Sequence, residues 1–539
     1  MLWIALHLPT LSLESFVATL AAGEDEAAAE RPVALLDAHR IASANAPAQA
    51  LGVKPGLKRA TALALAPRLV LGQADAARDA AALLPVAHAA LAFTPTVCLQ
   101  PATASGDSGD TVLLDVQASL RYFGGRERLL QRLHASLRPL GHAVRTASAA
   151  TAQGAAILAR VRPPPLCSDL AATRLALEAA PVWLLGPGRE HWEALQGMGL
   201  RTLGDLLALP RAGLARRFGE ALLAEIDCAV GHRPDPREPI VLPPAFESRL
   251  ELFARADTTE QVLQGASVLL ERLVAWLGAQ HAFVRRFKLL MHHETRWQEG
   301  DRTPQASALD IALAEPSRDS AHLLVLLREH LARLQLPAPT LELALQAEDI
   351  SKRAPANSEL FPTTRGEQEG LTRLIERLQA RLGASQVQHL VAVDDHRPER
   401  ASTMRPAEAA RGRHPAGARQ GAGRSGRVAA VPPGPRETAT GLLEQGRAGD
   451  RPVWLLPVPE PLVEQGAGPL LEGRPLQLLS GPERIEAGWW DGALAERDYF
   501  IAQAADGALV WLYRERLPLS ALAGGDAAAG GWFLHGRFG

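Results

Sequence analysis

Carboxylates near predicted strand ends are the first candidates for chemistry in this chain. Residues 3–8 (WIALHL) have the continuous apolar pattern of a buried strand, which ends at His7 and Leu8. The first carboxylate beyond this strand is Glu14, a full helical turn further along. A strand end that offers a histidine but no carboxylate is a poor ligand set for Mg²⁺, which prefers oxygen ligands.

A second candidate position precedes the strand that we predict over residues 111–116. Asp110 lies immediately before this strand, and Asp115 lies near its end. Two carboxylates can hold a pair of Mg²⁺ ions about 3.5–4 Å apart and activate a hydroxyl group for phosphoryl transfer. Asp110 and Glu14 are the one pair that could be tried in that role. We interpret Asp115 as a turn or strand-end cap.

A glycine-rich turn between two predicted helices could contact DNA. In the stretch GMGLRTLGDLL an apolar helix leads into Gly197 and Gly199, and a second helix begins near Thr202, just after Arg201. Glycines permit a tight turn, and the amides at a helix N-terminus can face a phosphate without reading sequence. The pattern is typical of a helix-hairpin-helix motif, and an ordinary corner between two helices is the structural alternative.

A basic strand is the other candidate contact to DNA. The stretch FVRRFKLLMHHE (283–294) alternates so that Arg286 and Lys288 share one face while Phe287 and Leu289 share the other. A basic sheet face can lie along a phosphate backbone. The alternative is an ordinary solvated face of a sheet.

The elements that would position these residues change character along the chain. Strands and helices alternate over residues 1–165, which predicts an α/β layer domain. Short helices with Gly-rich turns follow over 170–235, and two helices with about four strands over 245–348 predict a small α+β domain. Residues 397–427 contain eight arginines, two glutamates and much Gly, Ala and Pro, so we predict a flexible linker over 397–450. A frameshifted stretch of the gene is the alternative for residues 400–450.

Composition restricts the class of protein further. The chain has 539 residues, enough for several domains of roughly 100–200 residues each. Its formal net charge of −2 means that any binding of nucleic acid must come from local basic surfaces. Three separated cysteines predict neither a disulfide framework nor a metal site and fit a reducing cytoplasm. No apolar run reaches the roughly 18 residues of a membrane span, so no membrane contact is expected.

The order of these elements resembles the Y-family (UmuC/DinB-like) translesion DNA polymerases. The segment SANAPAQALGVKPGL (43–57) is similar to a conserved stretch of their fingers, and LLDVQAS (113–119) is similar to a stretch of their palm. The resemblance implies a right-hand fold followed by further segments. The implied divisions are a palm (1–9 and 81–165), fingers (10–80), a helix-hairpin-helix thumb (166–240), a little finger (241–350), a clamp-binding and helical segment (351–396), the linker (397–450) and a C-terminal Trp-rich module (451–539).

The positions that carry polymerase chemistry do not match the family. Its first metal-binding aspartate falls on His7 or Leu8. Its later Asp-Glu pair falls on Asp110 and Thr111 when counted back from Leu114. Counted forward from Val97, the pair falls on residues 103 and 104, a threonine and an alanine. Either count lacks the glutamate.

The family's contacts to the incoming triphosphate are also missing. The fingers Tyr and Arg fall on Ala46 and Gln49, and a palm Lys falls near Gln153. A lost triphosphate contact removes the positioning on which the reaction depends. We therefore expect a polymerase-like scaffold that has no catalytic residues and needs no metal or cofactor.

The C-terminal region carries the most specific strings. RPVWLLPVPEPL (451–462), LLSGPERIEAGWWDG (478–492) and WFLHGRFG (532–539) resemble the C-terminal region of the ImuB proteins, the polymerase-like members of bacterial SOS mutagenesis cassettes. VDDHRPE (393–399) extends the resemblance upstream. It implies an adaptor that binds the β sliding clamp, a RecA-related ImuA-like protein and an error-prone DnaE-type polymerase.

A clamp-binding peptide and a tryptophan-rich module complete the expected sites. In NSELFP, Leu360 and Phe361 would fill the clamp's apolar pocket, with Asn357 in place of the usual Gln. A loop anchor on its own domain is the alternative. Trp489, Trp490 and Trp511 could stack on bases, but we interpret them as core residues of a β-rich, protein-binding module.

These observations predict a cytoplasmic, non-catalytic, DNA-binding adaptor for SOS-induced translesion synthesis at damaged or primer-template DNA. An active Y-family polymerase is the enzymatic alternative. A plain helix-hairpin-helix DNA-binding protein is a third, which leaves the Trp-rich region unexplained.

Overall fold

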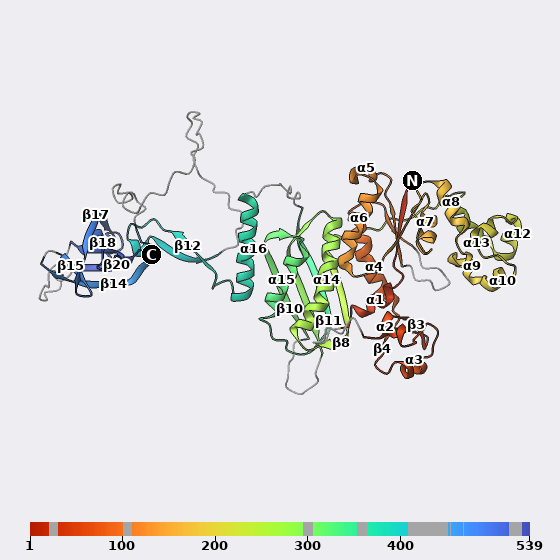
Figure 1. Ribbon diagram of the computed structural model, residues 1–539, viewed down its shortest axis with the longest axis horizontal. Helices are drawn as coiled ribbons and strands as arrows, with labels where there is room; N and C mark the ends of the chain where they lie inside the picture. Colours follow the sequence, from red (N-terminus) through yellow and green to blue (C-terminus); the bar gives the residue numbers. More distant parts are fainter. Residues whose placement is uncertain are drawn as a thin grey trace, which may run out of the picture. The chain divides into compact units, whose positions relative to one another are not determined.

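The computed structural model describes residues 1–20, 31–100, 110–294, 305–352, 364–407, 451–452, 454–466, 468–516 and 531–538 (Figure 1). The chain forms two compact units, Met1–Gly383 and a second unit that begins at Ala384. This division places the predicted 351–396 segment partly in each unit. Each unit is described by itself below.

The first unit begins with an antiparallel sheet of four strands in the order β5-β6-β1-β7. The strands are β1 (Trp3–His7), β5 (Val97–Leu99), β6 (Thr111–Asp115) and β7 (Arg145–Ala149). All five residues of β1 are buried because the strand is central and both faces of the sheet are covered. The predicted strands at 3–8 and 111–116 therefore lie side by side.

Alternate residues of β1 enter two different cores. Ile4, Leu6 and Leu8 pack against α4 (Ala76–Leu91) and α6 (Arg126–Leu137) on one face. Trp3 and Ala5 face α7 (Ala152–Leu158) on the other. The short helices α1 (Leu11–Val17) and α5 (Leu120–Phe123) follow β1 and β6. This alternation puts His7 on the α7 face, since side chains in a strand point to opposite faces in turn.

A small separate sheet holds the region similar to the fingers. Its strands β2 (Val33–Asp37), β3 (Arg40–Ala44) and β4 (Val70–Gln73) have the order β3-β2-β4. The helices α2 (Ala46–Ala50) and α3 (Arg59–Leu65) pack on it. The Asn45 side chain caps α2 by accepting a hydrogen bond from the amide of Ala48 at 3.0 Å, which fixes the start of the helix.

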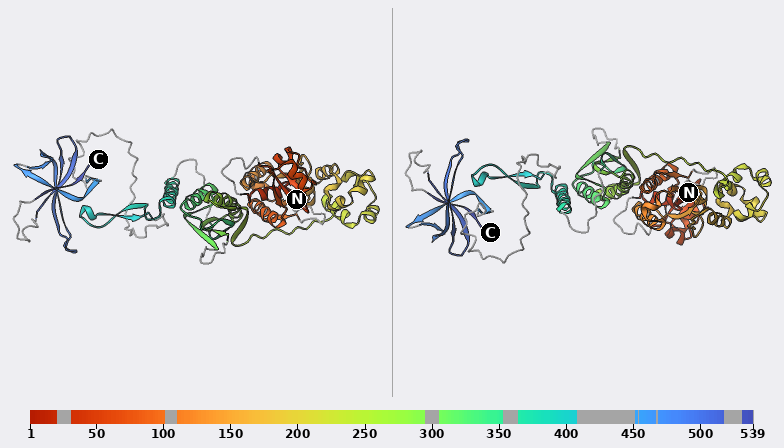
Figure 2. Two further views of the ribbon diagram at one scale, coloured as in Figure 1. Left: turned by 90° about the horizontal axis from the view of Figure 1, so that it is seen from below. Right: turned by 90° about the horizontal axis from the view of Figure 1, so that it is seen from above.

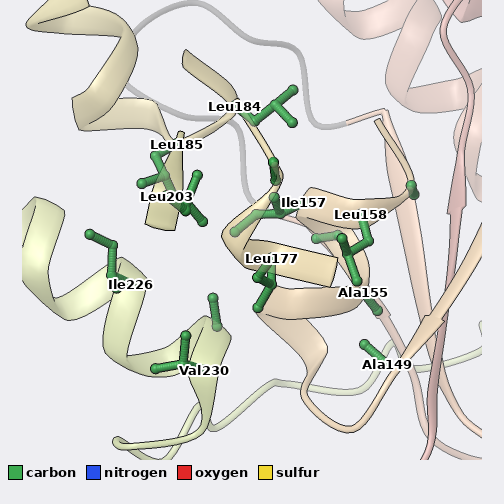
Figure 3. Packing of buried hydrophobic residues seen from close by; sticks show 14 of the residues in the cluster. Ala149, Ala155, Ile157, Leu158, Leu177, Leu184, Leu185, Leu203, Ile226 and Val230 are labelled. Atoms are coloured by element: carbon green, nitrogen blue, oxygen red, sulfur yellow. The ribbon is translucent and has the colours of Figure 1, made fainter. Parts of the chain in front are cut away.

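Short helices follow over residues 170–230. They are α8 (Leu170–Glu178), α9 (Gly186–Glu190), α10 (Trp192–Gly197), α11 (Leu203–Leu207), α12 (Arg211–Phe218) and α13 (Glu220–Val230). Their apolar side chains form one core with α7 and the first sheet, in which Ile157, Leu203 and Ile226 come together (Figure 3). This shared core anchors the helical region to the sheet.

The α+β region that follows is a four-stranded antiparallel sheet in the order β10-β9-β11-β8. The strands are β8 (Phe246–Ala256), β9 (Phe283–His293), β10 (Ala306–Ser317) and β11 (Thr340–Ser351). Helices α14 (Thr259–Ala279), α15 (Ser320–Leu331) and α16 (Thr364–Leu382) accompany it. Among the described residues, α14 is the one helix whose length and composition would suit a membrane span, but it is a core helix of this sheet.

The second unit contains a hairpin and a larger sheet. The hairpin is β12 (Gln388–Ala392) with β13 (Ser402–Pro406), and seven strands form the order β16-β15-β14-β20-β19-β18-β17. These strands are β14 (Trp454–Gln465), β15 (Gly468–Leu471), β16 (Arg474–Pro475), β17 (Gln477–Ala487), β18 (Ala495–Gln503), β19 (Leu509–Glu515) and β20 (Trp532–Arg537). Their fanned directions show a strong twist (Figure 2).

The predicted start of the linker at residue 397 is wrong. Arg397 is only 2% exposed, and β13 continues the ordered chain to Pro406. The Arg-rich composition concealed this hairpin because its strands carry exposed polar side chains and show no apolar period. Residues 408–450 lie outside the described residues.

Candidate functional site

The structure brings together the three positions at which the polymerase family would hold metal ions. In the register of β1 and β6, His7 lies opposite Thr111, and the amide of Leu8 donates to the carbonyl of Asp110 at 2.9 Å. His7 Nδ1 lies 3.2 Å from the Thr111 hydroxyl and 3.1 Å from Asp110 Oδ1. Counting back from Leu114 therefore gives residues that meet the end of β1, whereas residues 103 and 104 lie outside the described residues.

This cluster does not fit a pair of Mg²⁺ ions. It offers one carboxylate, one imidazole and one fully buried hydroxyl, and the carboxylate already contacts the imidazole. Arg145 lies opposite His7 on the other neighbouring strand, β7. Burial and the nearby Arg162 lower the pKa of Arg145. A pair of Mg²⁺ ions needs several oxygen ligands, more than this cluster supplies.

Glu14, the other carboxylate considered for a metal pair, has different partners. It accepts a hydrogen bond from the Thr10 hydroxyl at 2.6 Å, lies 3.1 Å from His142 Nδ1 and accepts from the amide of Ala143 at 3.2 Å. These contacts tie α1 to the turn before β7. The Glu14 carboxylate is therefore engaged with Thr10, His142 and Ala143, while Asp110 contacts His7. Asp115 accepts from the amide of Gln117 at 3.2 Å, in agreement with a structural cap.

Ala46 and Gln49 line a cavity of about 600 Å³ beside α1, α4 and α14. Gln49 donates to the carbonyl of Ala44 at 2.6 Å and is exposed. Arg272 is the arginine that lines this cavity. Its guanidinium points to β8 and donates a hydrogen bond to Ser248 Oγ at 3.1 Å. The cavity therefore offers little positive charge to replace the missing contacts to a triphosphate.

Gln153 has a structural role that the sequence did not predict. Its side-chain oxygen accepts from Arg237 Nη2 at 2.7 Å, and its side-chain nitrogen donates to Glu225 Oε1 at 2.7 Å. The backbone amide of Gln153 donates to Asp235 Oδ2 at 3.1 Å. The residue is only 7% exposed, so this position joins three parts of the chain by buried hydrogen bonds.

Arg237 extends this network to the sheet. It donates to Gln100 Oε1 at 2.9 Å and to Asp235 Oδ2 at 2.7 Å. Ile240 then donates its amide to the carbonyl of Val97 on β5 at 2.8 Å. The chain between α13 and β8 is thus fastened along the first sheet. Burial raises the pKa of Glu225, although Gly186 and Gln153 donate hydrogen bonds to its carboxylate.

The predicted hairpin at residues 197–202 has the expected backbone path. α10 ends at Gly197, Gly199 adopts φ +79°, and Thr202 begins α11 with a capping box that includes Asp205. The amides of Arg201 and Thr202 both donate to Asp205 Oδ2 at 2.9 Å. These bonds lower the pKa of Asp205. These two amides are therefore paired within the turn, and the Arg201 side chain is exposed beside them.

The predicted basic face of β9 has acidic neighbours. Arg286 is exposed, but in register it lies beside Asp349 of β11. Lys288 lies opposite Asp310 of β10, with 3.9 Å between Nζ and Oδ2. The sequence could not predict these carboxylates because strand order and register place them there. They weaken the attraction of this face for phosphate.

Other predicted sites have mixed outcomes. Asn357, Leu360 and Phe361, the expected clamp-binding peptide, lie outside the described residues. Trp511 is buried and stacks on Tyr499 with 4.0 Å between ring centroids, as a core residue should. Trp489 and Trp490 are 73% and 52% exposed, so their prediction as core residues is wrong.

The structure reveals a docked segment within the second unit. The Arg397 guanidinium contacts Asp395 at 2.6 Å and Asp491 at 2.7 Å, and it donates to the carbonyl of Ala493 at 3.0 Å. Glu399 pairs with Arg497 at 3.0 Å. The strings VDDHRPE and GWWDG, noticed separately in the sequence, therefore form one contact.

Comparison with known proteins connects these features to a family. A model of the impB/mucB/samB family matches residues 11–160. Proteins named ImuB from two strains of Caulobacter vibrioides are each 29% identical over 513 residues, which cover 91% of this chain and 100% of theirs. The chain is thus similar to these ImuB proteins along almost its whole length. This finding confirms the resemblance to ImuB proteins that the C-terminal strings predicted.

Solved Y-family structures were also found. An insertion ternary complex of Dbh DNA polymerase is 16% identical, with a TM-score of 0.37 and coverage of 66% of this chain and 100% of that chain. DinB from Sulfolobus solfataricus is 17% identical, with a TM-score of 0.35 and coverage of 65% and 99%. The mixed α/β and α+β fold class, with a β-rich C-terminal region, agrees with the prediction.

Proposed function

We propose that the chain is a non-catalytic, DNA-binding adaptor in SOS-induced, error-prone translesion synthesis. In this proposal it links primer-template or damaged DNA to the β sliding clamp, an ImuA-like RecA-related protein and a DnaE-type polymerase that performs the synthesis. It acts in the cytoplasm. Homology to ImuB along 91% of the chain supports this assignment.

The observation that carries the non-catalytic part is the contact of His7 with Asp110 and Thr111. The end of β1 presents an imidazole 3.1 Å from the one carboxylate of the cluster. A two-metal phosphoryl transfer would need further carboxylates at this point. Gln153, at the position of the family's triphosphate-binding lysine, is held by Arg237 and Glu225. In this proposal, the end of β1 and Gln153 correspond to two independent parts of the polymerase site, and both are engaged in structural contacts.

DNA binding is the second part of the proposal. The Gly197–Thr202 hairpin presents Arg201, and β9 presents Arg286 and Lys288. Because Asp205, Asp310 and Asp349 lie beside these groups, we expect weak binding that does not depend on DNA sequence and that falls as salt rises. The clamp contact would be made by Asn357, Leu360 and Phe361.

The first test is primer extension with Mg²⁺ and with Mn²⁺, beside a salt titration of binding to the same primer-template. Binding without extension supports the adaptor. Extension that disappears in Asp110→Ala and persists in a matched exposed control, Asp37→Ala, would establish a working metal site and an active polymerase. No binding at low salt would overturn the DNA-binding part.

The clamp contact has a separate test. A synthetic peptide that spans residues 355–363 should compete with a known clamp ligand, and the same peptide with Leu360 and Phe361 changed to Ala should not. Equal behaviour of the two peptides would remove these residues from the proposal.

A further inference from the structure

The helix α16 (Thr364–Leu382) packs on its own domain through a face that mixes polar and apolar side chains. Glu376 is 8% exposed, and its carboxylate lies 2.9 Å from His322 Nε2 on α15. One helical turn on either side, Thr372 and Ala380 are also buried. Arg333 donates to the carbonyl of Ala380 at 3.3 Å. A carboxylate thus lies at the centre of the contact with α15 and β10, beside which α16 lies (Figure 1).

The opposite face of α16 exposes leucines. Leu371, Leu374, Leu378 and Leu382 are 57%, 51%, 37% and 54% exposed. Their spacing of three, four and four residues puts them in one row along the helix, which we call the leucine stripe. A surface helix normally turns its apolar row towards the core and its polar side chains to water. On α16 the leucine row instead faces away from the domain, while Thr372, Glu376, Ala380 and the half-buried Ile375 make up the packed side.

A row of arginines lies along one side of the leucine stripe. Arg373, Arg377 and Arg381 follow each other at intervals of four residues and are exposed. Arg373 pairs with Asp319 at 3.2 Å. In the part of the chain that the structure describes, Arg377 and Arg381 have no ion pair. The stripe therefore has an apolar centre and a positively charged edge.

We propose that the leucine stripe binds an amphipathic helix of a partner protein, whose leucine-type row is flanked by acidic side chains. Leu371, Leu374 and Leu378, at intervals of three and four residues, have the a and d spacing by which two helices interlock, and Leu382 lies next to the following d position. The charged edge selects an acidic partner, since carboxylates would meet Arg377 and Arg381. A second copy of this chain fits less well, because pairing two stripes brings like-charged arginine rows towards the same interface.

This inference rests on the adaptor function and identifies one surface that such a protein would use for a partner. It does not depend on DNA binding, since none of the stripe residues belongs to the hairpin or to β9. The protein can therefore lose one of the two binding activities, for DNA or for the helix, and retain the other, and both can be measured on one preparation.

The test uses two designed helical peptides with Leu at the a and d positions of each heptad. One has Glu at e and g, and the other has Lys. Fluorescence anisotropy with the full-length protein should show at least tenfold tighter binding of the acidic peptide. Equal binding of both peptides, or binding of neither, would overturn the proposal. A salt titration of binding to primer-template DNA in the same samples reports the proposed function independently.

Three variants sharpen the test. Leu374→Gln with Leu378→Gln should weaken binding of the acidic peptide more than tenfold, because each leucine buries apolar surface in the complex. Leu175→Gln with Leu341→Gln makes the same change at leucines that are 70% and 40% exposed elsewhere, and it should have no effect. Arg377→Glu with Arg381→Glu should reverse the preference towards the Lys peptide.

Analytical ultracentrifugation distinguishes a partner helix from a second copy of this chain as the occupant of the leucine stripe. The full-length protein should stay monomeric at concentrations at which the acidic peptide binds. A concentration-dependent dimer that Leu374→Gln with Leu378→Gln abolishes would identify a second copy as the occupant and would overturn the proposal. Thermal unfolding of each variant checks that the α16 contact with His322 is preserved.

Discussion

Arg237 donates a hydrogen bond to the side chain of Gln153 over 2.7 Å, and the two residues lie 84 positions apart in the sequence. The resemblance to the polymerase family places a triphosphate-binding lysine near Gln153, where this chain has a neutral side chain that accepts from an arginine. Gln153 fastens the chain between α13 and β8 to the first sheet.

Gln153→Ala should lower the free energy of unfolding by about 1–3 kcal/mol, because Glu225 and Arg237 each lose a buried partner. Gln153→Lys should be at least as destabilising, since an ammonium group would lie against the Arg237 guanidinium. Urea unfolding followed by circular dichroism measures both. Gln49→Ala, at an exposed position, should change the value by less than about 0.5 kcal/mol. An unchanged transition in Gln153→Ala would contradict the role assigned to the network.

His7→Asp should not restore DNA synthesis. The substitution puts a second carboxylate beside Asp110, but Gln153, Ala46 and Gln49 still lack the contacts that position a triphosphate. We expect no primer extension and, because two carboxylates would meet in a buried place, a loss of about 1–3 kcal/mol in the free energy of unfolding. His7→Asn provides the control without added charge. Extension by His7→Asp would show that one residue separates this chain from a polymerase.

The two glycines of the hairpin should respond differently to alanine. Gly199 has φ +79°, so Gly199→Ala forces a side chain into the left-handed region and should lower the free energy of unfolding by about 1–2 kcal/mol. Gly197 lies in α10 with open space around it, and Gly197→Ala should be neutral or slightly stabilising. Differential scanning calorimetry distinguishes the two. If both substitutions are neutral, the turn does not need its glycine.

Acid should release the docked segment of the second unit. Hydrogen bonds from Arg397 hold the pKa values of Asp491 and Asp395 below their usual range. A carboxylate whose pKa is lower when folded contributes its stabilisation above its unfolded pKa of about 3.9 and loses it as pH falls through the folded value. The contact should therefore persist at pH 5 and weaken progressively below pH 4.

Trp490 reports on this release, because the Arg397 guanidinium lies 5.4 Å from its ring centroid. The fluorescence of Trp490 is obtained as the difference between the spectra of the unchanged protein and of Trp490→Phe. This difference spectrum should shift to longer wavelength below pH 4. Arg397→Lys should show the shifted emission already at pH 7, because a lysine cannot reproduce the forked contacts to two aspartates. Arg474→Ala, at an exposed arginine of β16, should keep the normal emission at pH 7. A pH-independent signal would contradict the assigned contact.

Local patterns predicted much of the fold. The apolar run at 3–8 gave the central strand, and the count back from Leu114 put Asp110 and Thr111 beside His7. The glycine spacing at 197–199 predicted the turn between α10 and α11. Each of these signals lies within a few residues, where periodicity and backbone conformation are readable from the sequence.

Long-range contacts were not predictable in the same way. Nothing near Gln153 or Arg237 marks them as partners, and the carboxylates beside Lys288 and Arg286 depend on strand register. The capping of the hairpin amides by Asp205 is local, and the Thr-x-x-Asp spacing from Thr202 could have predicted it. The composition led to a wrong prediction of the linker start at residue 397. Arg397 has three carboxyl or carbonyl partners in the structure, but nothing in the sequence distinguishes it from the other arginines of this polar stretch.

The segment between Ala407 and Arg451 has both of its ends in the same unit. Ala407 follows β13, whose hairpin is docked through Arg397, while Arg451 pairs with Glu483 of β17. The covalent path between the two units instead runs through residues 383–388. Shortening the Arg-rich segment therefore should not change how far the C-terminal unit can reach from the first unit. A single protease cut within it should leave the two fragments held together by the contact of Arg397 with Asp491.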